Sequence, residues 1–262
     1  MISSNALVHV QQISKSFSHA NQREQVLENI SLQIHQGEIL TILGQSGCGK
    51  STLLNIIGGF THEDEGQVLI GDVRVQRPGR RCIMLFQHYG LLPWRSVLKN
   101  VELGLEELHL SAEQRKQRAI EYLTIVGLED KLHLFPRHLS GGMQQRVAIA
   151  RALATKPELL LMDEPFAALD TFNRYYLQDE LLRIQQKEKT TMVLVTHDID
   201  EAIYLSDRIL IMSANPGRIH KELHIDISKP RDRSHGDFQY FRKIIFDHFH
   251  FNKTAESADY TI

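Results

Sequence analysis

The chain of 262 residues lacks several features that would assign it to a special class of protein. Its two cysteines, Cys48 and Cys82, are too few for a disulfide framework and favour two reduced thiols in a cytosolic protein. No apolar run reaches the roughly 18–20 residues that a membrane-spanning helix needs. We therefore expect any membrane role to be carried by a partner.

An excess of one charge is also missing. Lysine and arginine number 30, aspartate and glutamate number 32, and the formal net charge is -2. Nucleic-acid-binding proteins usually carry a clear basic excess, so we expect no nucleic-acid partner. The first ten residues contain no basic segment followed by an apolar one, so we expect no secretory signal. Hydrophobic residues make up 42%, which is an ordinary globular share and excludes general disorder.

The N-terminal part of the chain has the apolar patterns of β-strands. Residues 6–17 and 26–34 alternate between apolar and polar, and residues 68–75 contain a Gly-Asp pair typical of a hairpin. Residues 39–43 are continuously apolar, as in a strand that is buried on both faces. We predict an antiparallel β subdomain and a buried core strand.

Helical spacing begins near residue 96. Apolar residues recur every three or four positions as far as residue 135, and Gly127 ends one such run. We predict a helical subdomain at about residues 96–138, inserted into an α/β chain. The rest of the pattern alternates helices with strands, which we place at 141–154, 158–163, 171–187, 191–196 and 208–212. This alternation predicts an α/β fold with a mostly parallel sheet and right-handed crossovers.

A glycine-rich segment separates the buried strand from the helix that follows it. Its residues fit the phosphate-loop pattern and are Gly44, Gln45, Ser46, Gly47, Cys48, Gly49, Lys50 and Ser51. Glycines let backbone N–H groups point at phosphates, and the helix N-terminus adds partial positive charge. We expect Lys50 to contact the β- and γ-phosphates of ATP, Ser51 to bind Mg²⁺ and Thr52 to bond a phosphate oxygen. A glycine-rich turn that precedes a lysine by chance is the alternative, and the strand-to-helix context disfavours it.

Two acids follow another apolar run. Residues 159–162 are apolar, and Asp163 and Glu164 come directly after them. The C-terminal end of a parallel strand opens into the ligand crevice of such sheets. We assign Asp163 to Mg²⁺, through water, and Glu164 to the role of general base or water-positioning group. The alternative is a strand end with two solvated acids.

A second candidate phosphate site begins a later helix. Ser140 is a good N-cap, and Gly141 and Gly142 leave the backbone N–H groups of the helix start unobstructed. Because the phosphate loop already provides one such site, a second makes sense if it serves the nucleotide held by another copy of the chain. The motif therefore indicates a dimer.

Over roughly residues 6–226, the sequence resembles the ATP-binding subunits of ABC transporters, whose signature begins Leu-Ser-Gly-Gly. The resemblance implies a P-loop NTPase core that hydrolyses ATP between two copies. It also implies that Gln87 contacts Mg²⁺ and the attacking water, that His197 binds the γ-phosphate, and that Asp170 communicates across the dimer. Phe17 lies where the family places an aromatic ring that stacks on adenine. Taken alone, Phe17 fits a core residue, His197 a helix cap and Gln87 a surface amide.

Three segments resemble one group within this family, the nitrate, sulfonate and taurine importers and their pyrimidine-precursor relatives. They are residues 90–95, 163–170 and 215–219. The resemblance implies a permease dimer, a separate solute-binding protein that selects the solute, and a place at the cytoplasmic face of the membrane. Residues 91–95 would meet the permease, unless this loop packs on the chain's own core.

Two other functions are considered. A soluble ABC ATPase acting on ribosomes or DNA usually has two ATPase units in one chain or a long coiled-coil insertion, and neither is present. A non-catalytic module would have lost Lys50, Glu164 or His197, and all three are present. Residues 1–226 are expected to form the ATP-binding domain. Residues 227–262 read as polar and irregular, and as an extension they form either a regulatory segment or, as we favour, a packed C-terminal helix.

Overall fold

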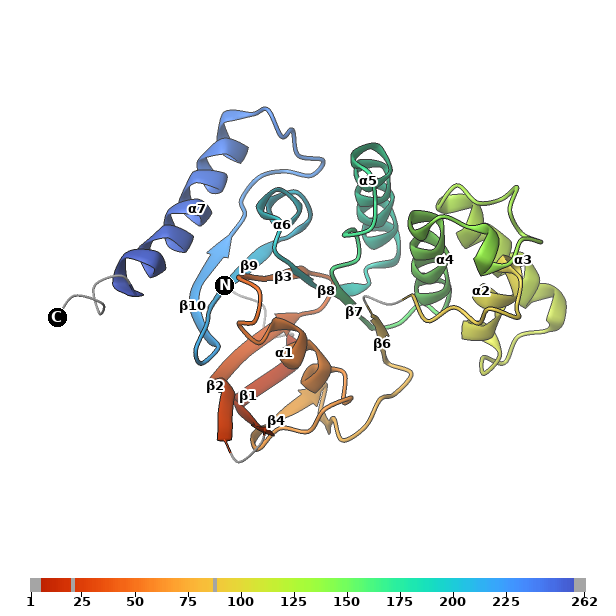
Figure 1. Ribbon diagram of the computed structural model, residues 1–262. Helices are drawn as coiled ribbons and strands as arrows, with labels where there is room; N and C mark the ends of the chain where they lie inside the picture. The colour runs from red at the N-terminus through yellow and green to blue at the C-terminus, as the bar shows by residue number, and fades with distance from the viewer. Residues whose placement is uncertain (1–5, 20–21, 87–88, 257–262) are drawn as a thin grey trace. The chain divides into compact units, whose positions relative to one another are not determined.

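Alternating apolar residues in the N-terminal part of the chain form an antiparallel sheet. The computed structural model describes residues 6–19, 22–86 and 89–256, and it divides into one unit of residues 1–78 and 193–262 and a second of residues 79–192. In the first unit, the four-stranded sheet has the order β2-β1-β4-β5, and its strands are β1 (Ala6–His19), β2 (Gln22–His35), β4 (Glu65–Ile70) and β5 (Val73–Arg74). The first three of these strands are labelled in Figure 1. The predicted β subdomain and its hairpin are confirmed.

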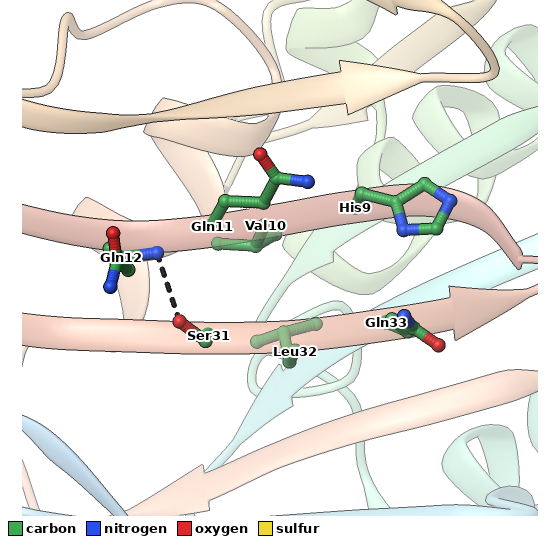
Figure 2. Close-up of a pocket in the computed structure, with 7 residues that line it drawn as sticks. All are labelled: His9, Val10, Gln11, Gln12, Ser31, Leu32 and Gln33. Carbon is green, nitrogen blue, oxygen red and sulfur yellow. Dashed lines mark hydrogen bonds between the residues drawn. The ribbon is translucent and has the colours of Figure 1, made fainter.

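The outer face of β1 and β2 is polar. Both strands contain residues with positive φ at register shifts, Gln12 and Asn29, and the Gln12 amide donates to the Ser31 hydroxyl at 2.9 Å. Figure 2 shows the shallow hollow here, of about 490 Å³, in which His9 and Gln33 lie on neighbouring strands. None of the residues singled out by the sequence patterns lies in it.

The second sheet of the first unit surrounds the predicted core strand. Its strands lie in the order β10 (Arg218–His224), β9 (Arg208–Ser213), β3 (Ile39–Gly44) and β8 (Thr191–Thr196). Every residue of β3 and β8 is buried, which explains their unbroken apolar runs. β3 and β9 are parallel, as predicted, whereas β10 adds an antiparallel edge strand that we did not predict.

Three helices belong to the first unit: α1 (Lys50–Ile57), α6 (Ile199–Leu205) and α7 (Gly236–Glu256). α7 packs against α6 (Figure 1) and buries Phe238 and Ile245. The composition suggested an irregular C-terminal segment, and this prediction is wrong for residues 236–256, which form a helix. The favoured alternative of a packed C-terminal helix agrees with the structure.

The second unit contains the predicted helical segment. Its parallel strands β6 (Cys82–Leu85) and β7 (Leu159–Asp163) are accompanied by α2 (Val97–Leu105), α3 (Ala112–Ile125), the 3₁₀ turn η1 (Pro136–His138), α4 (Gly141–Ala154) and α5 (Thr171–Glu188). α2, α3 and α4 pack against one another (Figure 1). Ser111 begins α3 with a reciprocal capping box, and Gly127, at φ 65°, follows its end. Within the described residues, no helix is long and apolar enough to span a membrane.

Candidate nucleotide site

The phosphate loop connects β3 to α1 in the first unit. Gln45, Ser46 and Gly47 form its exposed crest, and Gly47 has φ 84°, a conformation that favours glycine. Gly49, at φ 93°, is the N-cap of α1, and its carbonyl accepts from the Leu53 amide at 2.9 Å. No side chain caps α1, so the N–H groups of its first turn remain directed at the loop.

Lys50 lies inside this loop rather than in solvent. The residue is only 6% exposed, and its ammonium group donates to the carbonyls of Gly44 at 2.9 Å and Gln45 at 2.8 Å. A buried ammonium group held by carbonyl dipoles, with no carboxylate among these partners, suits an incoming anion. Exposed backbone donors, a helix N-terminus and this cation together fit a polyphosphate.

Cys48 is a buried small residue of the loop. Its sulfur lies 3.9 Å from the Lys50 Nζ, and the residue is almost fully buried. Burial raises the pKa of the Cys48 thiol, and the Lys50 charge offsets only part of that rise. The environment therefore favours the interpretation of Cys48 as a packing residue over that of a reactive thiol.

The predicted acids lie at the end of β7 in the second unit. Asp163 is the last residue of the strand, and Glu164 follows with φ 48°. A non-glycine residue in the left-handed region is strained, and such residues cluster at functional sites. Both side chains are part-exposed, so they are accessible to water and ions. Carboxylate oxygens are among the hard ligands that Mg²⁺ prefers. In the first unit, the Ser51 residue of the phosphate loop is exposed as well.

The predicted signature begins α4, also in the second unit. The Ser140 hydroxyl accepts from the Met143 amide at 3.3 Å, and Ser140 and Gly141 are exposed. A Cβ at Gly142 would lie 3.0 Å from the Leu169 side chain, so the start of α4 packs closely on the loop before Asp170. The N-terminus of α4 is therefore open to an anion on one side and fixed on the other.

A buried glutamine connects α4 to the acidic turn. The Gln145 side-chain amide donates to the carbonyl of Pro165, one residue after Glu164, and Gln145 is almost fully buried. Sequence patterns did not single out Gln145, although a polar residue on the buried side of an amphipathic helix was a readable signal. The signature helix and the acidic turn are thus joined within one unit.

Asp170 begins α5 and is exposed. Its carboxylate accepts from the Asn173 amide at 3.0 Å, and hydrogen bonds from the Asn173 side chain and backbone lower the pKa of Asp170. In this structure the residue is a helix cap, which leaves its predicted role across a dimer untested. The neighbouring Phe172 is largely exposed.

His197 follows β8 in the first unit and is exposed. Asp198 caps α6 by accepting from the Glu201 amide at 3.1 Å, so the histidine itself is not the helix cap. His197 lines a hollow of about 670 Å³ that continues along α7 past Arg242 and Lys243. The sequence patterns missed this neighbourhood of His197, because they favoured a packed C-terminal helix without predicting which residues it contacts.

Phe17 and Gln87 are the remaining predicted residues, and the structure describes only the first of them. Phe17 is 37% exposed near the end of β1, and the Lys15 ammonium lies 5.4 Å from its ring centroid. An exposed ring with a cation nearby agrees better with a stacking surface than with a core residue. Gln87 lies outside the described residues. Among residues 6–19, 22–86 and 89–256, no group of three His, Cys, Asp or Glu side chains is placed to hold a metal ion.

The loop of residues 90–95 projects the chain's single tryptophan outward. Trp94 is 72% exposed, whereas Asn100 of α2 is fully buried beneath the loop. The Asn100 side chain accepts from the Leu92 amide at 2.8 Å and donates to the carbonyls of Leu92 at 3.1 Å and Arg95 at 2.9 Å. The hydrogen bonds of Asn100 thus hold the loop in place with Trp94 exposed to solvent, and Trp94 does not pack into the core. Asn100 was missed, since its role depends on a loop eight residues earlier.

Each unit therefore carries part of the predicted site. The first unit holds Phe17, residues 44–52 and His197, and the second holds residues 140–142, Asp163, Glu164 and Asp170. Within the first unit, the phosphate loop and Lys50 are brought together as predicted. Within the second, the signature packs against the loop that leads to Asp170.

Comparison with known proteins identifies relatives for almost the whole chain. Residues 27–167 match the family model described as ABC transporter. An uncharacterized ABC transporter ATP-binding protein of Methanocaldococcus jannaschii, MJ0412, is 49% identical over 91% of this chain and 89% of its own. Aliphatic sulfonates import ATP-binding proteins named SsuB are 46% identical in Bacillus cereus, over 96% of this chain and 99% of the relative, and 47% identical in Bacillus subtilis, over 94% and 95%.

Solved structures of ATP-binding cassettes also match this chain. The dimeric structure of a post-hydrolysis state of the ATP-binding cassette MJ0796, bound to ADP and Pi, matches with a TM-score of 0.78. That match has 34% sequence identity and covers 84% of this chain and all of the other. A second structure, the dimeric bacterial ABC transporter cassette MJ0796, matches equally well. The predicted α/β cassette fold is confirmed.

Proposed function

The chain belongs to the ABC transporter family, whose ATP-binding proteins are ATPases coupled to transport, and we propose that it is the motor subunit of an importer. The observation that carries the proposal is the pairing of two phosphate-binding features in one chain. One is the loop around the buried Lys50, and the other is the open helix start at Ser140. Two such features suit two nucleotides shared between two copies.

ATP is proposed to lie between the loop of residues 44–52 of one copy and residues 140–142 of the other. Lys50 exchanges its loop carbonyls for phosphate oxygens, which are stronger acceptors because they are charged. Phe17 offers its exposed ring face to adenine. The dimeric MJ0796 structures support this assembly, because a relative of the same fold forms a dimer with ADP and Pi bound.

Hydrolysis is assigned to the part-exposed Glu164 after β7 and the exposed His197 after β8, together with Gln87. Glu164 positions and deprotonates the attacking water, and His197 and Gln87 contact the γ-phosphate and the water. Ser51, Gln87 and, through water, Asp163 would hold Mg²⁺, which would neutralise charge on the phosphates. Asp170 relays the state of one site to the partner copy.

The permease is proposed to dock at the loop that carries Trp94. A hollow of about 410 Å³ lies beside it, and it is lined by Trp94, Arg95, Ser96, Lys99, Glu102, Glu106, Arg115 and Phe135. An exposed aromatic ring on a rigid loop, flanked by paired charges, is typical of a binding hot spot. Docking here places the chain at the cytoplasmic face of the membrane.

The solute is proposed to be nitrate, a sulfonate, taurine or a related small solute. Relatives named for aliphatic sulfonate import, at 46–47% identity over nearly the whole chain, support this class. Selection among these solutes is assigned to a separate solute-binding protein, which meets the permease and not this chain.

The test is a pull-down from detergent-solubilised membranes of the source organism. The bait is the Glu164→Gln variant, saturated with ATP and Mg²⁺, and the expected result is recovery of a polytopic membrane protein. Trp94→Ala in the same background should lower that recovery, whereas Tyr240→Ala, which removes a similarly exposed ring of α7, should not. Recovery of only ribosomal or DNA-bound partners by an active, dimeric bait would contradict the importer function.

A further inference from the structure

The turn between β9 and β10 lies directly against the phosphate loop. Gly217 ends this turn, and its amide donates to the Val26 carbonyl of β2 at 2.9 Å. Its own carbonyl accepts from the Glu28 amide at 3.0 Å, so Gly217 forms a parallel bridge to Leu27. These bonds hold the backbone of residue 217 in one place, between β2 and the loop.

The space around Gly217 admits no side chain. A Cβ at this position would lie 2.3 Å from the Cys48 carbonyl oxygen and 2.8 Å from the Val26 carbonyl oxygen. Real Cβ atoms essentially never approach another heavy atom within 3.0 Å, and both neighbours here are backbone atoms that cannot rotate away. Because Gly217 has no positive φ, the requirement for glycine comes from this close approach alone.

Two glycines of the phosphate loop are also closely packed. A Cβ at Gly49 would meet the Leu27 side chain at 2.6 Å, and one at Gly44 would meet the Met212 carbonyl of β9 at 3.1 Å. Leu27 therefore contacts both Gly49 and the turn, at 3.2 Å from the Gly217 Cβ position. The two ends of the loop, at Gly44 and Gly49, are therefore closely packed, whereas its crest at Gly47 is open.

An ion pair at the surface fastens the turn to β2. The Arg218 Nε donates to the Glu28 carboxylate at 2.9 Å, one residue after Gly217. Exposed ion pairs of this kind contribute only about 0–1 kcal/mol to stability. The backbone hydrogen bonds of Gly217 therefore set the position of the turn, and the ion pair adds to them.

We propose that Gly217 is a positioning residue for the phosphate loop and acts through the Cys48 carbonyl that it contacts. Its missing side chain lets the turn buttress the loop, which keeps the backbone N–H groups and Lys50 in the geometry that binds phosphate. The inference rests on the proposed function, because it takes residues 44–52 as the ATP-binding loop. It accounts for part of the segment 215–219, which the resemblance to importers singled out without a role.

The experiment compares ATP binding by wild type and Gly217→Ala, using a fluorescent methylanthraniloyl ATP analogue with Mg²⁺. The added methyl group must push the Cys48 carbonyl away, and a displacement of about 1 Å can cost about 100-fold in rate. We expect the Kd to rise about tenfold or more and kcat/KM to fall about 10- to 100-fold, together with some loss of stability from the added methyl group. A purely structural role predicts a lower melting temperature with an unchanged Kd, and this result would overturn the proposal.

Two reference variants separate this inference from the proposed function. Gly236→Ala adds the same methyl group where no atom lies within 4 Å, and it should bind ATP as wild type does. Lys50→Ala should lose ATP binding if the loop is the nucleotide site. If Lys50→Ala binds normally, the proposed site is wrong; if only Gly217→Ala binds normally, the site stands and the positioning role is wrong.

If Gly217→Ala does not fold, a milder substitution at Arg218 tests whether the turn positions the phosphate loop. Arg218→Gln releases the turn from Glu28 without adding volume, and we expect the Kd for the same analogue to rise about threefold. Arg80→Gln removes a comparable exposed pair with Glu107 in the other unit and should leave the Kd unchanged. Equal Kd values for Arg218→Gln and wild type would overturn the proposal.

Discussion

Glu164 combines two properties at the scale of a single residue. It follows a buried strand, and its backbone has φ 48°, a strained value for a residue with a side chain. The surrounding structure must hold this conformation, and the hydrogen bond from Gln145 to the next residue, Pro165, does part of this. The strain suits a residue whose side chain must point at one particular water.

Replacing Glu164 by glutamine preserves the shape of the side chain and removes its capacity to accept a proton. We therefore expect Glu164→Gln to keep ATP binding and to lose about 100-fold or more in turnover, measured as phosphate release. Glu107→Gln, an exposed glutamate of the same unit, is the control and should turn over normally. Near-normal turnover by Glu164→Gln would remove the base assignment.

The two cysteines make a second prediction at this scale. Burial raises the pKa of Cys48, despite the opposing Lys50 charge, and raises the pKa of Cys82 to about 12. Because only the thiolate is nucleophilic, neither residue should react readily with iodoacetamide at about pH 8 in the native protein. Mass spectrometry should find both labelled only after denaturation; fast native labelling of Cys48 would contradict the described loop.

At the scale of elements, long apolar runs and strong caps were readable from the sequence. The buried strands β3 and β8, and α4 with its Ser140 cap, lie close to where the patterns placed them. β10 was missed because it is an exposed edge strand of mostly polar residues. α7 agrees with the C-terminal helix that we favoured, but its bounds and its packing through Phe238 and Ile245 were not predicted.

The packing of α7 is testable through Phe238. Its ring is almost fully buried, so Phe238→Ala should destabilise the protein by about 3–5 kcal/mol, measured by urea unfolding. Tyr240 of the same helix is 62% exposed, and Tyr240→Ala should change stability by less than about 0.5 kcal/mol. Equal effects of the two substitutions would mean that α7 is not packed through Phe238.

The candidate site was predictable to the extent that its chemistry is local in sequence. Glycines, lysine and hydroxyls within nine residues identified the phosphate loop, and an acid after an apolar run identified Glu164. Asn100, Gln145 and Gly217 were not identified, because each acts on a backbone segment distant in the chain or reached only through the fold. No periodicity records that Gly217 faces the Cys48 carbonyl.

At the scale of the whole molecule, the proposal requires two copies for one complete site. Ser140→Arg would place a long charged side chain at the exposed start of α4, where the partner's nucleotide is proposed to bind. We expect this variant to bind ATP as a monomer and to form no ATP-dependent dimer. Dimerisation of Ser140→Arg with ATP would show that the signature is not the second half of the site.

The measurement that tests the central claim most directly is the mass of Glu164→Gln in solution, by sedimentation velocity with and without ATP. Because this variant binds ATP but does not hydrolyse it, the bound nucleotide should hold two copies together. The account predicts one chain without nucleotide, two chains with ATP, and one chain again with ADP. A monomer that binds ATP at full occupancy would contradict the shared nucleotide site.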